Sequence, residues 1–228
     1  MAPSRHTSAP AEPNAPASFP SRRERRSAEL RERVFRSALQ LFGSKGYAET
    51  TVEDITAAAD VGKGTFFNYF PSKEHVLISF SQMQLKKLET VIGELRACGL
   101  PLQECLHRMA QRMTELPIQN PGVVRALLQA HTSSPLVREE MFRVHHEQRR
   151  LVGSLLALGQ ERGEVRRDMA AEDLAQIMRQ MIFGTLLFWS LVGDASLTAR
   201  VQQALHLLWG GMAAPNSQGP AGSAGEKR

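Results

Sequence analysis

The sequence predicts an all-α protein. Apolar residues recur at spacings of three and four along most of the 228-residue chain, and no long stretch alternates with period two. Gly and Pro residues divide this pattern into segments of helical length. We expect a smaller amino-terminal helical domain over residues 21–75 and a larger carboxy-terminal helical domain over residues 76–213.

The two ends of the chain predict no folded structure. Residues 1–20 are rich in Pro and Ala, residues 214–228 are rich in Gly, Ser and Pro, and neither has enough apolar surface to offset ordering entropy. The start of the chain lacks the apolar segment of a secretory signal, and the most apolar stretch, Met181–Val192, is shorter than the ~20 residues of a membrane span. We therefore expect a cytoplasmic protein.

Basic residues are concentrated near the start of the folded region. The net charge of +5 and the pI of about 9.6 suit a polyanionic partner. Residues 22–36 hold seven arginines and three glutamates, whereas residues 74–214 are close to charge balance. Two interpretations remain open for the first four arginines: a solvated helix start, or an arm that reaches the minor groove or backbone of DNA. These four are Arg22, Arg23, Arg25 and Arg26.

Little in the sequence predicts catalysis or metal binding. Cys98 and Cys105 are too few for a disulfide framework and match no zinc spacing, so we expect free thiols. His145 and His146 would point about 100° apart on a helix, which does not suit a shared metal ion. The sequence shows no nucleophile–base pair and no phosphate loop. We expect no enzyme, no metal and no cofactor.

The first helix is expected to start near Arg22. Its apolar stripe over residues 34–42 has the helical period. The sequence GSKGY ends it, with Gly43 or Gly46 available for a left-handed cap.

Two short helices separated by a tight turn are expected next. The second helix begins with one of two alternative capping boxes, Thr50–Glu53 or Thr51–Asp54, and the sequence DVGKG ends it. A third helix covers about Lys63–Tyr69, and Ser72 caps a long fourth helix. Two short helices joined by a Gly-containing turn and braced by a preceding helix form a helix-turn-helix, here over about residues 51–70.

The third helix concentrates aromatic residues in the sequence KGTFFNYF. Phe66 and Phe70 are four residues apart, so they share a face and are expected to pack in the core. Phe67 lies about 100° round the helix from Phe66 and cannot share that face. The outward side chains are those of Lys63, Thr65, Phe67, Asn68 and Tyr69. A lysine, hydroxyls, an amide and exposed rings suit insertion into a DNA groove.

Residues 50–77, TTVEDITAAADVGKGTFFNYFPSKEHVL, resemble the DNA-binding motif of the TetR/AcrR family of bacterial transcriptional regulators. The resemblance extends back through ALQLFGSKGYAETT to about residue 28. It implies a homodimer whose amino-terminal domains bind a palindromic operator and whose carboxy-terminal helices bind a small molecule that releases it. The matching positions are Phe42, Gly46, Tyr47, Thr50, Thr51, Ile55, Ala58, Val61, Lys63, Gly64, Thr65, Tyr69, Phe70, Lys73 and Glu74.

The resemblance also implies DNA-contacting positions, with phosphate contacts for Thr51 and Lys73. The family usually has Tyr at the position of Phe67, so apolar contact with a base methyl or sugar is expected to replace a hydrogen bond there. Tyr69 keeps a hydroxyl at a backbone-contacting position, and Gly62 stands where the family commonly has a capping Ser. The predicted DNA-binding set is Thr51, Lys63, Gly64, Thr65, Phe67, Asn68, Tyr69 and Lys73.

Five further helices are expected, at about 101–116, 121–132, 135–163, 171–192 and 196–212. The helix over 171–192 is apolar on both sides in its second half, so both sides need cover. Its own domain covers one side, and a second subunit is the natural cover for the other, as the last two helices provide in the resembled family. A wholly intramolecular core is the alternative. The expected interface residues are Phe183, Leu187, Leu191, Leu205 and Trp209.

The helices before this pair are expected to hold the effector pocket. Methionines adapt to irregular apolar ligands, although each also suits ordinary core packing. The candidates are Met83, Met109, Met113, Met141 and Phe142. Three histidines are candidate polar contacts, with a solvated or structural role as the alternative: His131, His145 and His146. The sequence assigns no individual effector-binding residue.

The function predicted from these features is transcriptional repression with ligand-induced derepression. A homodimer would bind a palindromic duplex DNA operator and would leave it when a small apolar effector binds. Two alternatives remain: a DNA-bound adaptor whose carboxy-terminal half recruits a protein, and a helical enzyme, for which the sequence offers no site.

Overall fold

The computed structural model describes residues 21–115, 120–193 and 196–215. Within these ranges the chain is helical and contains no strand, which confirms the predicted all-α class. Residues 1–20 and most of the predicted carboxy-terminal tail lie outside the described part. The helices are α1 (Arg22–Ser44), α2 (Val52–Ala58), α3 (Lys63–Tyr69), α4 (Lys73–Ala97), α5 (Leu102–Met113), α6 (Pro121–Ser133), α7 (Pro135–Glu161), α8 (Ala171–Val192) and α9 (Leu197–Met212).

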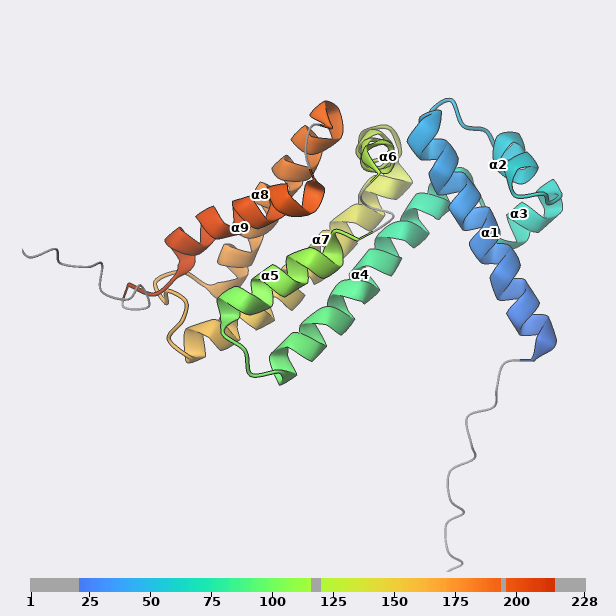
Figure 1. Cartoon of the computed structure of the whole chain (residues 1–228). Helices are drawn as coiled ribbons and strands as arrows, with labels where there is room; N and C mark the ends of the chain where they lie inside the picture. Colours follow the sequence, from blue (N-terminus) through green and yellow to red (C-terminus); the bar gives the residue numbers. More distant parts are fainter. Residues whose placement is uncertain (1–20, 116–119, 194–195, 216–228) are drawn as a thin grey trace, which may run out of the picture.

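The helices form a small group at one end of an elongated molecule and a larger bundle at the other (Figure 1). The helices α1, α2 and α3 make the small group, with α2 and α3 on the side of α1 that faces away from the bundle. In the bundle, α7 packs between α4 and α8, and α9 packs against α8 and α5. The helix α6 lies between α1 and α8 and contacts both.

Side-chain caps fix where α1 and α2 begin. Ser21 and Glu24 form a capping box at the start of α1, and Thr51 and Asp54 form one at the start of α2. Of the two predicted registers for α2, the structure has the second. Thr50 is buried instead, and its hydroxyl donates to the Gly46 carbonyl oxygen at 2.6 Å, which ties it to the preceding turn.

Gly46 provides the left-handed residue of the turn between α1 and α2, with a φ of +95°. Gly43, the other predicted cap, is inside α1, where it lies against α6. A Cβ atom on Gly122 of α6 would overlap the Gly43 carbonyl group, so the close approach of the two helices requires Gly at position 122, whereas a Cβ atom on Gly43 would meet the Asn120 side chain.

Each end of the molecule has its own hydrophobic core. The amino-terminal core contains α1–α3, the start of α4, and residues of α6 and α7. It is rich in rings, with Phe66 and Phe70 at 5.9 Å between centroids and Phe42 and Tyr47 at 5.4 Å. The carboxy-terminal core is built from α4–α9. The helix α4 runs through the predicted domain boundary at residues 75 and 76 without a break, so that boundary stays a prediction.

The helix α6 contributes to both cores. Val123, Ala126 and Ala130 belong to the amino-terminal core, whereas Val124 and Leu128 face the carboxy-terminal core. Arg125 donates a hydrogen bond to the Ser190 carbonyl oxygen of α8. The helix α6 therefore links α1 to α8 and to the interior of the bundle.

None of the described helices is long and apolar enough to cross a membrane.

Candidate nucleic-acid interface and internal cavity

The helix α3 separates its aromatic residues between the core and the surface. Phe66 is fully buried and Phe70 is 1% exposed, whereas Phe67 is 51% exposed. The ring of Phe67 meets that of Phe66 edge-on at 5.4 Å, so the core supports the exposed ring from behind. Gly64 and Asn68 are also exposed, and Thr65 is half-buried. The predicted burial of Phe66 and Phe70 and the exposure of Phe67 are confirmed, whereas Tyr69, predicted to lie outward, packs partly against the amino-terminal core.

Lys63, at the start of α3, forms an ion pair with Glu53 of α2. Both side chains are exposed, and the hydrogen bond from Lys63 holds the pKa of Glu53 below its ordinary value. This pair orients the lysine at the front of α3. An ammonium group carries three N–H donors, so Lys63 retains donors for a phosphate while it is paired with Glu53.

Thr51 lies at the start of α2 on the same outer surface. Its hydroxyl oxygen accepts a hydrogen bond from the Asp54 backbone N–H at 3.1 Å and retains a proton to donate. Hydrogen bonds from Lys45 and Thr51 lower the pKa of Asp54 to about 2, so the cap stays ionised at neutral pH. The backbone N–H groups of an α2 start held in this way suit an approaching phosphate.

Two predicted DNA-binding residues have contacts within the domain. The hydroxyl groups of Tyr69 and Ser27 are hydrogen-bonded at 3.1 Å, which ties the end of α3 to α1. Lys73 donates to the carbonyl oxygens of Tyr47, Ala48 and Thr50 at 2.9, 3.3 and 3.1 Å, which uses all three of its N–H groups. In this structure Lys73 holds the loop between α1 and α2, and its phosphate contact stays a prediction.

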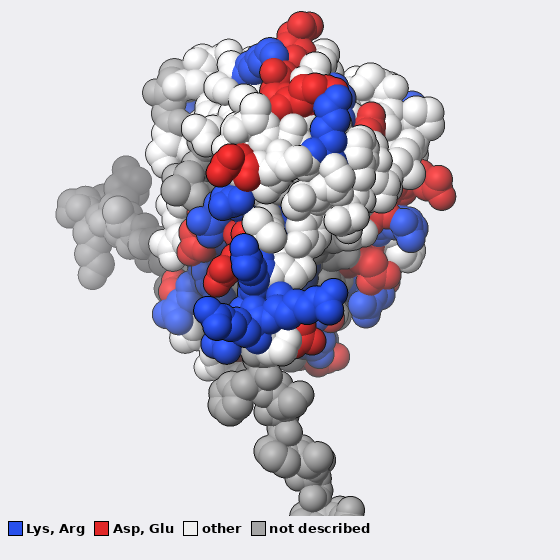
Figure 2. Space-filling view, turned by 90° about the vertical axis from the view of Figure 1, so that its right-hand side faces the viewer, with Lys and Arg blue, Asp and Glu red and all other residues white. Residues whose placement is uncertain are grey.

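The first two turns of α1 carry Arg22, Arg23, Arg25 and Arg26, so within the described residues these four arginines belong to a helix and not to an extended arm. All four are exposed, and none forms an ion pair with a described residue. Cations at a helix start oppose the helix dipole, and only Glu24 offsets them in the first turn. Figure 2 shows basic side chains gathered at this end of the α1–α3 face. The positive charge at the start of α1 destabilises the isolated helix, and it favours the binding of an anionic partner.

A cavity of about 280 Å³ lies inside the carboxy-terminal core, lined by residues of α4–α9. Of the predicted pocket candidates, Met109, Met113 and Met141 line it. Met83 and Phe142 do not line it; they are 41% and 63% exposed, because each lies on the outer side of its helix. Most of the wall is apolar, so the cavity suits a ligand with a hydrocarbon body.

Polar side chains also reach the cavity wall. The rings of His131 and His145 lie 6.3 Å apart between centroids, and Gln84, Gln148 and Arg179 line the same cavity. Burial, together with the positive charge of Arg179 and the neighbouring His131, lowers the pKa of His145 to about 4. His145 is therefore neutral at pH 7. His146 points elsewhere and is exposed.

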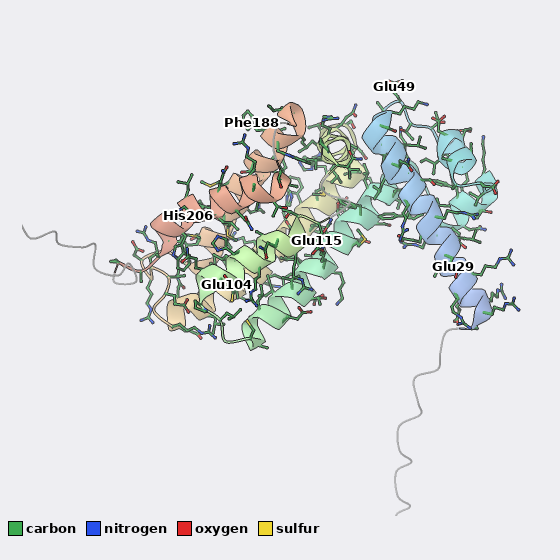
Figure 3. The ribbon with its side chains drawn as sticks, viewed as in Figure 1. Glu29, Glu49, Glu104, Glu115, Phe188 and His206 are labelled. Atoms are coloured by element: carbon green, nitrogen blue, oxygen red, sulfur yellow. The ribbon has the colours of Figure 1, made fainter. Side chains whose placement is uncertain are left out.

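The outer side of α8 and α9 carries exposed apolar side chains. Phe188 is 68% and Leu207 73% exposed, and Figure 3 shows Phe188 on the outer side of α8. Leu191 and Val192 are also exposed. The prediction of Leu205 as an interface residue is wrong: it is 3% exposed and lines the cavity, because it shares the inner stripe of α9 with Val201.

The other predicted interface residues differ in how far they are exposed and in what they contact. Phe183 is 40% exposed but also lines the cavity, Trp209 packs partly against the carboxy-terminal core, and Leu187 is half-buried. Leu207 was not among the predicted residues. It lies about 200° from Leu205 round the helix, so a correct register for α9 would have identified it.

Sequence reasoning also missed Gln84 and Arg179 as cavity residues. Arg179 is the only charged residue of α8 after Asp173, and an isolated cation within an apolar helix is a signal of a buried polar site. The described residues contain no group of three or more His, Cys, Asp and Glu that could hold a metal ion. Both cysteines are free, Cys98 exposed and Cys105 buried.

Sequence comparisons identify relatives that are transcriptional regulators. Residues 34–80 match a family described as "Bacterial regulatory proteins, tetR family". The HTH-type transcriptional repressor DhaR of Mycobacterium sp. (strain GP1) is 29% identical over 153 residues, which are 65% of this chain and 76% of DhaR. The HTH-type transcriptional repressor KstR of Mycobacterium tuberculosis (strain ATCC 25618 / H37Rv) is 25% identical over 186 residues, 80% of this chain and 81% of KstR.

Among solved structures, the chain is similar to FadR of Thermus thermophilus, a TetR-family transcriptional repressor in complex with lauroyl-CoA. The TM-score is 0.62 with 28% sequence identity, and the match covers 84% of this chain and 100% of that one. The similarity thus extends beyond the helix-turn-helix into the carboxy-terminal bundle. Residues 34–80 thus match the TetR family of bacterial regulatory proteins, and the fold of the whole described chain is similar to that of a TetR-family transcriptional repressor.

Proposed function

We propose that the protein is a ligand-responsive repressor that binds a palindromic operator as a homodimer and leaves it when a small molecule enters the carboxy-terminal cavity. The observation that carries this proposal is the outer face of α3, where a half-exposed Phe67 and the lysine of the Lys63–Glu53 pair stand on a buried aromatic core. A short helix supported in this way enters a major groove without deforming its own domain.

The DNA contacts divide into two kinds. Thr51, Lys63 and the α1 arginines lie where they would contact phosphate, which gives affinity without sequence information. Gly64, Thr65, Phe67 and Asn68 lie where α3 would meet base edges, and the ring of Phe67 suits a thymine methyl group. Tyr69 keeps α3 attached to α1 and remains close enough to the surface for a backbone contact.

The exposed apolar side chains of α8 and α9 support a homodimer. In such a dimer, Phe188, Leu191, Val192 and Leu207 would pack against the same residues of a second copy about a two-fold axis. Two-fold symmetry would then present the two α3 helices to successive major grooves, about 34–36 Å apart or a related spacing.

The route from the cavity to DNA runs through α6. Val124, Leu127, Leu128 and His131 of this helix line the cavity, and its other side packs against α1 in the amino-terminal core. Because Gly122 and Gly43 are in direct contact, a ligand that shifts α6 also shifts α1 and the helix-turn-helix. FadR of Thermus thermophilus with bound lauroyl-CoA supports ligand binding in this fold.

DNA binding is tested by fluorescence anisotropy with a labelled duplex from the region upstream of the protein's own gene, over a series of KCl concentrations. The logarithm of the affinity is expected to fall linearly with the logarithm of the salt concentration. Lys63→Ala is expected to weaken binding by about tenfold. Lys86→Ala is the matched control, because Lys86 is also exposed and also paired with a glutamate.

The repressor assignment is abandoned if no salt-dependent binding is found, either to that duplex or to duplexes selected from a random library. An equal loss in Lys63→Ala and Lys86→Ala would leave DNA binding in place but would remove α3 as its surface.

The dimer is tested by sedimentation equilibrium. Leu207→Glu is expected to give a folded monomer, because it places a charge in the centre of the apolar face. Leu136→Glu is the matched control: Leu136 is an exposed leucine of α7, away from α8 and α9, and its substitution should leave the association unchanged. A monomeric parent protein would contradict the proposed dimer.

A further inference from the structure

His131, His145 and Arg179 form a polar cluster in the largely apolar wall of the cavity. His131 of α6 and His145 of α7 are adjacent, at 6.3 Å between ring centroids, and Arg179 of α8 is close enough to influence the titration of His145. Gln84 of α4 and Gln148 of α7 also line the cavity. Helices that are distant in the sequence therefore bring hydrogen-bonding groups to one hollow.

The charge of this cavity has one sign. Arg179 is a permanent cation, and no Asp or Glu is among the residues that line the cavity. Arg179 also forms no ion pair with any residue in the described ranges. A partly buried guanidinium without an anionic neighbour is unfavourable, because its desolvation is not offset by a counter-charge.

Two further polar atoms at the cavity have no partner. Gln84 Oε1 and His131 Nδ1 are both shielded from solvent and make no hydrogen bond in the structure. Buried polar atoms of folded proteins are nearly always hydrogen-bonded, so two such atoms beside one hollow indicate a missing partner. The cation and the two unpaired atoms are independent observations, and both concern the same cavity.

We propose that the effector of this protein is an apolar monocarboxylic acid, whose carboxylate binds Arg179 and His131 and whose hydrocarbon body fills the methionine-rich part of the cavity. This inference rests on the proposed function of the cavity as an effector site. The guanidinium offers two parallel N–H groups to a carboxylate, and His131 adds a third donor when its Nδ1 carries the ring proton. Gln84 can hydrogen-bond a further polar atom of the ligand.

The number of charges selects a monoanion. Arg179 is the only permanent cation among the described residues that line the cavity, and one guanidinium neutralises one negative charge. A dianion would leave one charge unpaired in an apolar cavity. A cationic ligand would be repelled by Arg179, and a neutral alcohol would leave the guanidinium without a counter-ion.

The test compares ligands that differ only in their head group. Two matched sets are used: 4-phenylbutyrate, 4-phenyl-1-butanol and 4-phenylbutylamine, and decanoate, 1-decanol and decylamine. Isothermal titration calorimetry on the full chain at pH 7.5 gives each affinity. In at least one set the acid is expected to bind on the order of tenfold more tightly than the alcohol, and the amine least tightly.

Variants assign the preference to the proposed residue. Arg179→Gln is expected to bring the affinity of the acid down to about that of the alcohol and to change the alcohol by no more than about twofold. Arg179→Lys keeps the charge and is expected to retain part of the preference. Arg138→Gln, at an exposed arginine of α7 outside the cavity, is the control and is expected to match the parent protein.

Equal affinities of acid and alcohol in both sets, tighter binding of the amine, or no saturable binding of any acid below about 1 mM would overturn the proposal. An unchanged preference in Arg179→Gln would do the same. Operator binding by the same samples, measured without ligand, separates this failure from that of the repressor assignment: a protein that binds DNA but has no preference for acids remains a repressor with a different effector.

Discussion

The two hydrophobic cores differ in how completely they are filled. The amino-terminal core is closed around ring contacts such as Phe66–Phe70, whereas the carboxy-terminal core surrounds a cavity of about 280 Å³. A closely packed core transmits displacement and resists deformation, while a cavity lined by methionines accepts a ligand by local repacking. The difference places rigidity beneath α3, the proposed DNA-contacting helix, and compliance around the proposed effector cavity, with α6 in contact with both cores.

The largest expected effect is loss of a ring from the closed core. Phe66→Ala is expected to lower the free energy of unfolding by about 3–5 kcal/mol, because the site is fully buried and its surroundings cannot collapse. Met113→Ala, at the cavity wall, should lose less than about 2 kcal/mol, since Met113 is only partly buried. Urea unfolding measures both. Equal losses would contradict the difference between the cores.

Enlarging a buried alanine tests the same difference in the opposite direction. Ala38→Leu in α1 is expected to destabilise the protein by about 1–3 kcal/mol through overpacking, because Ala38 is fully buried among neighbours. Ala110→Leu in α5 extends into the cavity and should leave stability within about 1 kcal/mol of the parent while abolishing effector binding. Thermal unfolding and ligand titration distinguish the outcomes. A large loss in Ala110→Leu would show that the cavity is not available space.

The third prediction concerns pH and the carboxy-terminal core alone. The pKa of His145 is about 4 in the folded protein and 6.5 in the unfolded chain, so the unfolded chain binds more protons between these values. Above about pH 6.5 His145 is neutral in both states and the free energy of unfolding does not depend on its titration. As the pH falls toward 4, the free energy of unfolding decreases by roughly 1 kcal/mol, after allowance for the partial exposure of the ring. In His145→Phe this dependence should disappear.

Urea midpoints at pH 7.5 and pH 5 measure this effect. His146→Phe is the control, because His146 is the exposed neighbour of His145 on the same helix. A pH dependence that survives in His145→Phe would assign the titration to another group.

The smallest expected effect concerns the arginines at the outer edge of the proposed DNA-contacting region. Arg25→Gln is expected to reduce the slope of log affinity against log salt by about 1, with equal weakening for all DNA sequences, because an arginine on the first turns of α1 would contact phosphate. Arg138→Gln should leave the slope unchanged. An unchanged slope in Arg25→Gln would return the arginines to the solvated helix start that the sequence also allowed.

The helix-turn-helix was predictable because its signals are local. Capping boxes, a Gly-containing turn and the four-residue spacing of Phe66 and Phe70 act within one or two helical turns, and the observed bounds of α3 agree with the prediction. Even there, the choice between Thr50 and Thr51 as the cap required knowledge that Thr50 is buried and bonded to Gly46. The ion pair of Lys63 with Glu53 and the bonds of Lys73 also join residues of separate elements.

The sequence alone determined the helical class, the order and approximate limits of the helices, and the inner and outer faces of α3, because periodicity, caps and breakers depend on neighbouring residues. The tertiary structure alone decided that Leu205 points inward and Leu207 outward, that Gly122 meets Gly43, and that Gln84, His131 and Arg179 share one cavity. These relations depend on the rotation and packing of helices that lie far apart in the chain. Local patterns do not specify that rotation, whereas the competition for burial among all the helices does.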